Sequence, residues 1–145
     1  MYNFYETLFK DYQDYLIANS KYDPKVGKHS TYSPEKFPFV SFVLSDCTNS
    51  NNCSLDKREM YDNYYFTINI YTQDKVVENK IVASQIISDE LIKLTIKFFD
   101  KLNMYRTSCR PTPNIDEKIL RTTIQYQCGV GNMARLGIIR RWKYV

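Results

Sequence analysis

The sequence predicts an α+β fold, a small and largely antiparallel sheet packed against an N-terminal helix and one long central helix. Three observations lead to this prediction. Apolar residues follow helical spacing in residues 4–22 and again in residues 76–99, while four other segments alternate like strands. Those segments come in pairs on either side of the central helix instead of alternating strictly with helices. The length of 145 residues is typical of one domain, so we expect a single domain over residues 1–145.

The first expected element is an amphipathic helix of about four turns. Its apolar side chains recur at spacings of three and four residues: Phe4, Leu8, Tyr12, Tyr15 and Leu16. The helix is expected to end before Asp23 and Pro24, because proline cannot continue it. Residues 24–36 are rich in turn-forming and charged residues and are expected to form a loop.

Two strands are expected before the central helix. Residues 37–44 are aromatic and β-branched and form the first of them. In the second strand, alternate residues point to opposite sides: Phe66, Ile68 and Ile70 to one, and Tyr65, Thr67, Asn69 and Tyr71 to the other. The Asn- and Ser-rich residues 46–56 between the strands are expected to form a surface loop.

The central helix is expected to run from Val76 to about Phe99. Its charged residues occupy one sector, while its apolar residues spread over most of the remaining surface. An apolar arc this broad indicates a helix that is covered on more than one side. We expect the helix to lie on the sheet, with the N-terminal helix or another subunit as its second neighbour.

The last two strands are expected to form a hairpin. Residues 105–110 alternate until Pro111 and Pro113 stop the strand. Residues 120–128 alternate again, and one side of that strand carries Leu120, Thr122, Ile124, Tyr126 and Cys128. A break follows at the glycines near residue 130, and residues 136–142 could add a short final strand.

The formal net charge of +4 is too small to indicate a dedicated nucleic-acid surface. The excess is uneven, because Arg135, Arg140, Arg141 and Lys143 lie close together near the end of the sequence. Two interpretations of residues 136–145 remain open. The segment is either a solvated tail or edge strand, or a basic arm that docks on a partner or nucleic acid.

The four cysteines lack the short paired spacing of zinc sites, so we expect reduced thiols. Cys109 and Cys128 fall in strand-like segments and resemble small buried residues. A Cys47–Cys53 disulfide in the loop remains open. The first residues do not resemble a secretory signal, and no apolar stretch approaches the ~20 residues of a membrane span.

No catalytic constellation stands out in the sequence. The four glycines form no phosphate-binding loop, and His29 is the single histidine available for a nucleophilic triad. The neighbouring acids Asp89–Glu90 and Asp116–Glu117 lie on an expected helix face and in a turn, where acids are ordinary. We therefore expect no enzyme, no cofactor and no metal site.

Aromatic residues and arginines are the strongest candidates for contacts with partners. The chain holds 13 Tyr and 8 Phe, and the segment around Tyr65 and Tyr71 contains few basic residues. This favours core or protein interfaces over base stacking. Arg106 and Arg110 are expected on one face of their strand, joined by Arg121 from the next. Such a face is either solvated or pairs with carboxylates of a neighbouring subunit.

Three segments in this order resemble the tail-terminator proteins, also called tail-completion or minor capsid proteins, of tailed bacteriophages and prophages of Gram-positive bacteria. The segments are residues 37–42 (FPFVSF), 64–75 (YYFTINIYTQDK) and 104–116 (MYRTSCRPTPNID), the last followed by the strand up to Tyr126. The resemblance covers roughly residues 35–128. The composition, rich in Lys, Ile, Asn and Tyr, also fits an AT-rich genome.

The resemblance implies a structural virion protein that forms a hexameric ring at the junction of tail and neck, assembled in the bacterial host cytoplasm. The ring caps the tail tube, ends its polymerisation and provides a docking surface for the connector of the neck. Implied partners are further copies of the chain, the tail-tube protein, a neck or connector protein and, in contractile tails, the sheath protein. DNA at most passes through the ring, and no cofactor takes part.

Such a role asks for aromatic surfaces, arginine–carboxylate pairs and arms that reach neighbours. The candidate interface residues are Arg106, Arg110, Arg121, Arg140, Arg141, Tyr65 and Tyr71, and the candidate arms are residues 46–56 and 136–145. Two alternatives stay open. One is another neck or head-completion ring subunit, and the other is a small nucleic-acid-binding protein.

Overall fold

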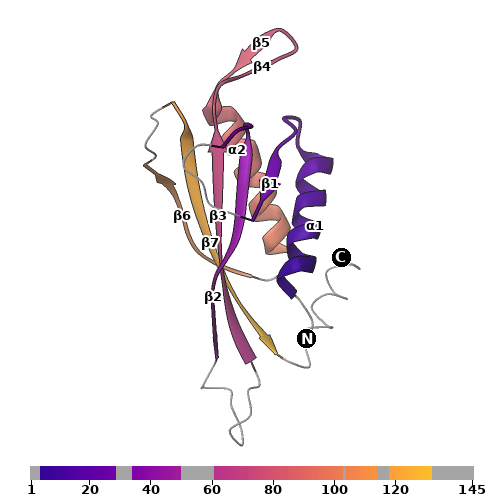
Figure 1. The fold of residues 1–145 in the computed structure, drawn as a ribbon, viewed down its shortest axis with the longest axis vertical. Helices are drawn as coiled ribbons and strands as arrows, with labels where there is room; N and C mark the ends of the chain where they lie inside the picture. The colour runs from indigo at the N-terminus through magenta and orange to yellow at the C-terminus, as the bar shows by residue number, and fades with distance from the viewer. Residues whose placement is uncertain (1–3, 29–33, 50–60, 103, 114–117, 132–145) are drawn as a thin grey trace, which may run out of the picture.

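The computed structural model describes residues 4–28, 34–49, 61–102, 104–113 and 118–131 (Figure 1). The first half of the chain contains α1 (Phe4–Asn19), β1 (Lys25–Gly27), β2 (Phe39–Asn49) and β3 (Tyr61–Thr72). The second half contains β4 (Lys75–Val77), β5 (Lys80–Val82), α2 (Ser84–Asp100), β6 (Tyr105–Thr112) and β7 (Leu120–Gly131).

The main sheet has five strands in the order β1-β2-β3-β7-β6. β1 runs parallel to β2, and the other neighbours in this sheet are antiparallel. Both helices lie on the same side of the sheet (Figure 1). The α+β prediction with a largely antiparallel sheet is therefore confirmed, including the adjacent pairing of the last two strands.

The hydrophobic core lies between the sheet and the helices. Alternate residues of β3 point toward the helices, so Phe66, Ile68 and Ile70 are buried there. Phe42 of β2 is the meeting point, because its ring lies 5.4 Å from the ring of Tyr12 in α1 and 5.7 Å from that of Phe99 in α2. Aromatic packing thus ties both helices to the same part of the sheet.

The helix α1 is the second neighbour of α2. The rings of Tyr12 and Phe98 lie 5.3 Å apart, and the buried hydroxyl of Tyr12 forms a 2.7 Å hydrogen bond with the hydroxyl of Thr95. At the end of α1, the backbone N–H of Lys21 donates to the Glu90 carboxylate. The prediction that α2 lies on the sheet is confirmed, and of the two second neighbours left open, the N-terminal helix or another subunit, the structure shows the N-terminal helix.

The predicted start of the central helix at Val76 is wrong. Residues 75–82 form the β4–β5 hairpin, which is a separate two-stranded sheet, and α2 begins only at Ser84. Glu78 and Asn79 make the turn with φ of 51° and 64°. Two successive left-handed residues suit the right-handed twist of a tight hairpin, and the β-branched residues on either side favour strand.

Three further strand predictions need correction. Residues 25–27, expected in a loop, form β1 because they pair with the start of β2. The segment 46–49, also expected in a loop, continues β2 because it pairs with the start of β3. Pro111 does not stop β6, which runs on to Thr112. Proline is tolerated there because β6 is an edge strand.

Some predictions fall outside the described residues. They concern loop residues 50–56, the possible strand at 136–142, and the basic segment 136–145 with Arg140 and Arg141. Within the described part of the chain, neither helix has the length and hydropathy needed to cross a membrane.

Candidate partner-binding surface

The main sheet has two faces of different character. The inner face packs on the helices, and the outer face points away from them. Strand register assigns the alternate residues of β3 and β7 to the outer face: Tyr65, Thr67, Asn69, Tyr71, Arg121, Thr123, Gln125 and Gln127. This composition, mainly aromatic and polar, matches the predicted alternation. The outer face is therefore the surface on which contacts with a partner are to be sought.

Arg106 does not share a face with Arg110, so this prediction is wrong. Arg110 lies opposite Thr123 of β7 on the outer face, whereas Arg106 lies opposite Tyr126, whose side chain is buried on the inner face. The register shifts between Arg106 and Ser108. Such a β-bulge inserts one extra residue, which reverses the side to which all earlier side chains of the strand point.

Arg106 instead acts on Tyr126. Burial raises the pKa of Tyr126 to about 12, and the positive charge of Arg106 opposes that rise. Tyr126 is only 1 % exposed and its ring stacks on Phe99 with a 4.6 Å centroid separation. The arginine therefore contacts a core residue at the rim of the inner face, next to the sheet edge.

A hydrogen-bonded network organises the outer face where β3 meets β7. The side-chain oxygen of Asn69 accepts a 3.2 Å bond from Nε of Arg121 and a 2.8 Å bond from the hydroxyl of Thr123. The Thr123 hydroxyl also lies 2.6 Å from that of Thr112 on β6. Asn69 is 1 % exposed, so its polar groups depend on these partners. Arg121 is thereby held in a defined orientation.

The ring of Tyr71 packs against the guanidinium of Arg121. The Arg121 guanidinium lies 5.4 Å from the centre of the Tyr71 ring, and Phe39 packs against the same ring at 5.9 Å. A cation over a ring face is attracted by the ring quadrupole. Tyr71 is fully buried. The candidate interface residue Tyr71 therefore positions Arg121 and does not itself reach the surface.

Arg110 and Arg121 form a pair on the outer face, called here the arginine pair. Arg110 lies opposite Thr123 and Arg121 lies opposite Thr112, so the two arginines are diagonal neighbours on adjacent antiparallel strands. Diagonal side chains of this kind lie within about 8 Å of one another. Arg110 is exposed and Arg121 is half-buried. Two guanidinium groups in this position can bind carboxylates or phosphates through paired hydrogen bonds.

Tyr65 lies at the other end of the outer face, beside a groove of about 270 Å³. The groove crosses four strands and is lined by Ser45, Asp46, Tyr65, Phe66, Thr67, Thr107, Gln125 and Tyr126. It lies between two register shifts, one after Leu44 in β2 and one at Thr107 in β6. Here the Thr107 hydroxyl donates a hydrogen bond to the backbone carbonyl of Gln125 in β7. The Ser45 hydroxyl likewise donates to the backbone carbonyl of Tyr65 in β3. Bulges thus shape this polar groove.

Sequence reasoning missed Asp46 and Thr107 as groove residues. Asp46 was assigned to a loop, and the outward position of Thr107 depends on the bulge. Asparagine- and serine-rich stretches resemble loops even when they extend a strand, and a bulge leaves no mark in a simple alternation. The exposed aromatic Tyr105, 70 % accessible at the start of β6, was likewise not singled out.

The arginine pair and the polar groove offer charged and hydrogen-bonding groups that can recognise a partner. No group of three or more His, Cys, Asp or Glu side chains lies close enough within the described ranges to hold a metal ion. Cys109 is exposed and Cys128 is half-buried, so the prediction of a small buried residue is wrong for Cys109. Cys47 and Cys53, and the disulfide left open between them, lie outside the described side chains. No known protein family matches the chain, and comparison with curated proteins likewise finds no match.

Proposed function

We propose that the protein is a tail terminator, a structural protein of a tailed bacteriophage or prophage. In this proposal copies of the chain form a ring that caps the tail tube, stops its growth and receives the connector of the neck. The observation that most supports this proposal is the order of the three segments that resemble tail-terminator proteins. They correspond to the start of β2, to β3 and to the β6–β7 pair, which are neighbours in one sheet. The α+β fold agrees with the fold that the resemblance implies.

The arginine pair supports an assembly role for the outer face. Arg110 is exposed, and Arg121 is already oriented by Asn69 and Tyr71. The Arg121 side chain therefore loses less entropy when it binds a carboxylate of a partner. Arginines held in this way are effective anchors at protein interfaces. We therefore assign the arginine pair to a contact with an acidic residue of the tube, the neck or a neighbouring subunit.

The test is assembly of the tail-tube subunit from the same genome in the presence and absence of this protein. Negative-stain imaging measures the length distribution of the tubes and the share of ends that carry a cap. We expect short tubes with a density at one end. Arg110→Glu and Arg121→Glu are expected to lower the capped share at least threefold. Lys10→Glu, an exposed charge reversal on α1, is the matched control.

Tubes that grow without limit and carry no density at either end would refute the terminator proposal. Tubes of unaltered length, together with binding of the protein to purified neck rings, would favour the alternative of another neck component.

The nucleic-acid alternative has one observation in its favour, namely the exposed Tyr105 at the start of β6. An exposed aromatic ring can stack on a base, whereas Arg106 points to the opposite face and does not add its charge to this ring. Binding to a single-stranded oligonucleotide that falls steeply with salt and is lost in Tyr105→Ala would favour this function. Salt-insensitive or absent binding would exclude it.

A further inference from the structure

The β4–β5 hairpin presents an apolar pair to solvent. Val76 and Ile81 lie directly opposite one another in the hairpin register, on the same face. They are 66 % and 77 % exposed, and Ile81 is the most exposed of the large hydrophobic side chains in the described residues. An isolated two-stranded hairpin is only marginally stable in water, so an apolar face left open on one indicates a missing partner.

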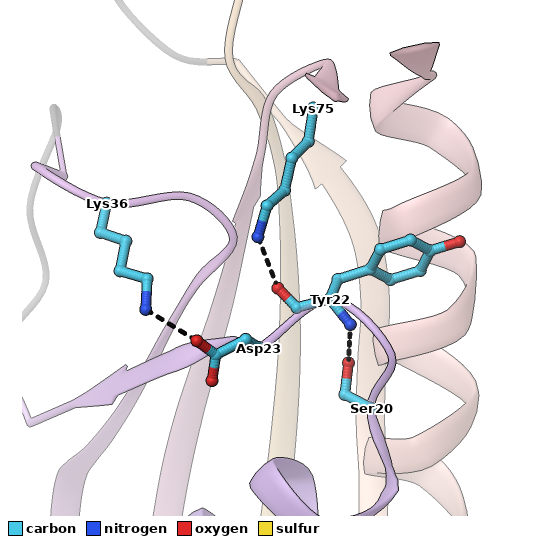
Figure 2. Close-up of polar contacts among 5 residues, drawn as sticks. All are labelled: Ser20, Tyr22, Asp23, Lys36 and Lys75. Atoms are coloured by element: carbon cyan, nitrogen blue, oxygen red, sulfur yellow. Dashed lines mark hydrogen bonds and ion pairs between the residues drawn. The ribbon is translucent and has the colours of Figure 1, made fainter. Parts of the chain in front are cut away.

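The base of the hairpin is fixed to the body of the protein. Figure 2 shows Lys75 reaching the backbone carbonyl of Tyr22, at 2.8 Å, in the linker between α1 and β1. On the other side, the Asp74 carboxylate accepts a 2.8 Å bond from the backbone N–H of Ser84 at the start of α2. The hairpin therefore extends from the end of the sheet as an arm with a fixed direction (Figure 1). A fixed direction reduces the entropy that docking costs.

The turn of the hairpin places an acid in a strained position. Glu78 has a φ of 51°, where asparagine, aspartate and glycine are the usual residues. Glutamate is not among the residues that favour this conformation, and its carboxylate stands at the exposed tip of the arm. Lys80 pairs with Val77 on the opposite face of the hairpin, so Glu78 is the charge closest to the Val76–Ile81 face. Strain retained at an exposed tip points to a role of that side chain in recognition.

A groove on α2, shallow and open to solvent, has the complementary character. It has a volume of about 490 Å³, a mainly apolar lining, and a border formed by Lys93, Ile96, Lys97, Asp100 and Lys101. Three lysines against one aspartate make the border positive. The groove runs from Lys93 to Lys101, the residue that follows the last helical residue Asp100, over about 12 Å at 1.5 Å per residue. Each strand of the hairpin is three residues long, about 10 Å, so the lengths agree.

The hairpin cannot reach the groove of its own chain. It joins α2 at Ser84, whereas Lys97 lies 13 residues further along the same helix, about 20 Å away. Its base is held at the near end by Asp74. Both surfaces are thus present on each copy, at opposite ends of one rigid helix. Such an arrangement can be satisfied only between copies, in a head-to-tail manner that leads to rings or open chains.

We propose that the β4–β5 hairpin of one chain docks in the α2 groove of a second copy, with Val76 and Ile81 against Ile96 and the Glu78 carboxylate among the groove lysines. As the contact between subunits of the capping ring, this rests on the proposed function. The contact area is small, so association in solution is weak and becomes strong only when several contacts form together.

The first test is sedimentation velocity of the purified full chain up to about 1 mM, where interactions of millimolar dissociation constant are detected. We expect concentration-dependent association. Ile81→Asp is expected to weaken it at least tenfold, and so is the double substitution Lys93→Glu with Lys97→Glu. Ile17→Asp, at an exposed isoleucine on α1, and Lys10→Glu are the matched controls. Far-UV circular dichroism shows that each variant is folded.

Mixing the two defective variants distinguishes a head-to-tail contact from a symmetric one. The Ile81→Asp chain keeps its groove, and the Lys93→Glu/Lys97→Glu chain keeps its hairpin. A mixture is therefore expected to form one-to-one dimers and nothing larger. A further charge swap, Glu78→Lys combined with Lys97→Glu, is expected to restore part of the association that either change removes.

Three results would overturn the proposal: a wild-type chain that stays monomeric at about 1 mM, association that Ile81→Asp leaves intact, or a mixture that does not associate. These outcomes are separable from failure of the proposed function. A wild-type chain that associates head-to-tail and leaves tube growth unchecked retains the docking contact and loses the terminator function. A chain that caps tubes and fails the three tests loses the docking contact alone.

Discussion

Two tyrosines, Tyr12 and Tyr126, place their hydroxyl groups in the aromatic core. Burial raises the pKa of both, and in each case one neighbour opposes the rise. For Tyr12 the neighbour is the Thr95 hydroxyl, and for Tyr126 it is the Arg106 side chain. The core between sheet and helices therefore contains titratable groups whose protonated form is the one compatible with folding.

Stability is expected to fall at high pH because of Tyr126. A tyrosine of the unfolded chain ionises near pH 10, whereas the folded protein keeps the Tyr126 proton up to about pH 12. The unfolded state therefore binds fewer protons in this window, and the free energy of unfolding decreases as pH rises through it. Urea unfolding at about pH 9 and about pH 11 measures the decrease.

Tyr126→Phe is expected to make that pH dependence shallower. An equal slope in wild type and Tyr126→Phe would show that other groups cause the decrease.

Removing the Tyr12 hydroxyl is expected to destabilise the protein at neutral pH. Tyr12→Phe leaves the Thr95 hydroxyl in a buried place without its 2.7 Å partner, and such a loss costs about 1–2 kcal/mol. Chemical denaturation provides the value. The double variant Tyr12→Phe/Thr95→Val removes both polar groups and should recover part of the loss. If the double variant lost more free energy of unfolding than the two single variants together, this account would be contradicted.

At the scale of single elements, α2 depends on a residue outside it. The N-cap residue Ala83 offers no side-chain hydrogen bond, and the N–H of Ser84 is satisfied by Asp74, which precedes the hairpin. A carboxylate near the start of a helix also interacts favourably with the helix dipole. The eight-residue hairpin 75–82 therefore brings the start of α2 back beside Asp74, the residue before the hairpin, so that Asp74 can cap the helix.

Asp74→Ala is expected to lower the free energy of unfolding by about 1 kcal/mol, the usual cost of a lost helix cap. Asp74→Asn keeps an acceptor and should lose less. The exposed Asp14→Ala on α1 serves as the control. Equal losses in all three variants would mean that the bond to Ser84 contributes nothing to stability.

The elements also show which local signals could be read in the sequence. The alternation of β3 and β7 predicted both faces of the sheet, because the two bulges of the sheet lie in their partners β2 and β6 and leave the alternation of β3 and β7 intact. The hairpin at 75–82 escaped, because its apolar residues fit a helical arc equally well and its turn residues, Glu78 and Asn79, are not a typical turn pair. In a segment this short, the sequence of a hairpin differs from that of a helix only in its turn residues.

The candidate surface was predicted only in part, for a similar reason. Arg110, Arg121 and Tyr65 were placed on the outer face by alternation, and the structure brings the two arginines together there. Arg106 was misplaced by one bulge residue, Thr107. The burial of Tyr71 follows from its packing under Arg121 and against Phe39. Contacts across strands of distant sequence cannot be derived from the pattern of one strand.

At the scale of the whole molecule, Phe42 joins both helices to the sheet. Its ring contacts α1 through Tyr12, α2 through Phe99 and the next strand through Phe66. Phe42→Ala is expected to cost about 3–5 kcal/mol, a large part of the roughly 5–15 kcal/mol that stabilises a typical domain. Both helices should loosen together, since they share this contact.

The matched control is Phe39→Ala, three residues earlier on the same strand. Phe39 is half-buried and packs on the outer face against Tyr71, so its loss should cost less than that of Phe42. Thermal unfolding followed by circular dichroism gives the ranking. A variant at position 39 less stable than the variant at 42 would place the main core on the outer face.

The two edges of the main sheet restrict how copies of the protein can meet. One edge, β1, offers only three residues, and the other, β6, carries a bulge at Thr107, Pro111 and two arginines. Each of these features opposes the addition of a further strand. Continuous sheets across copies are thereby disfavoured at high protein concentration. Growth of an assembly is thus left to side-chain contacts, which are reversible and can correct errors of placement.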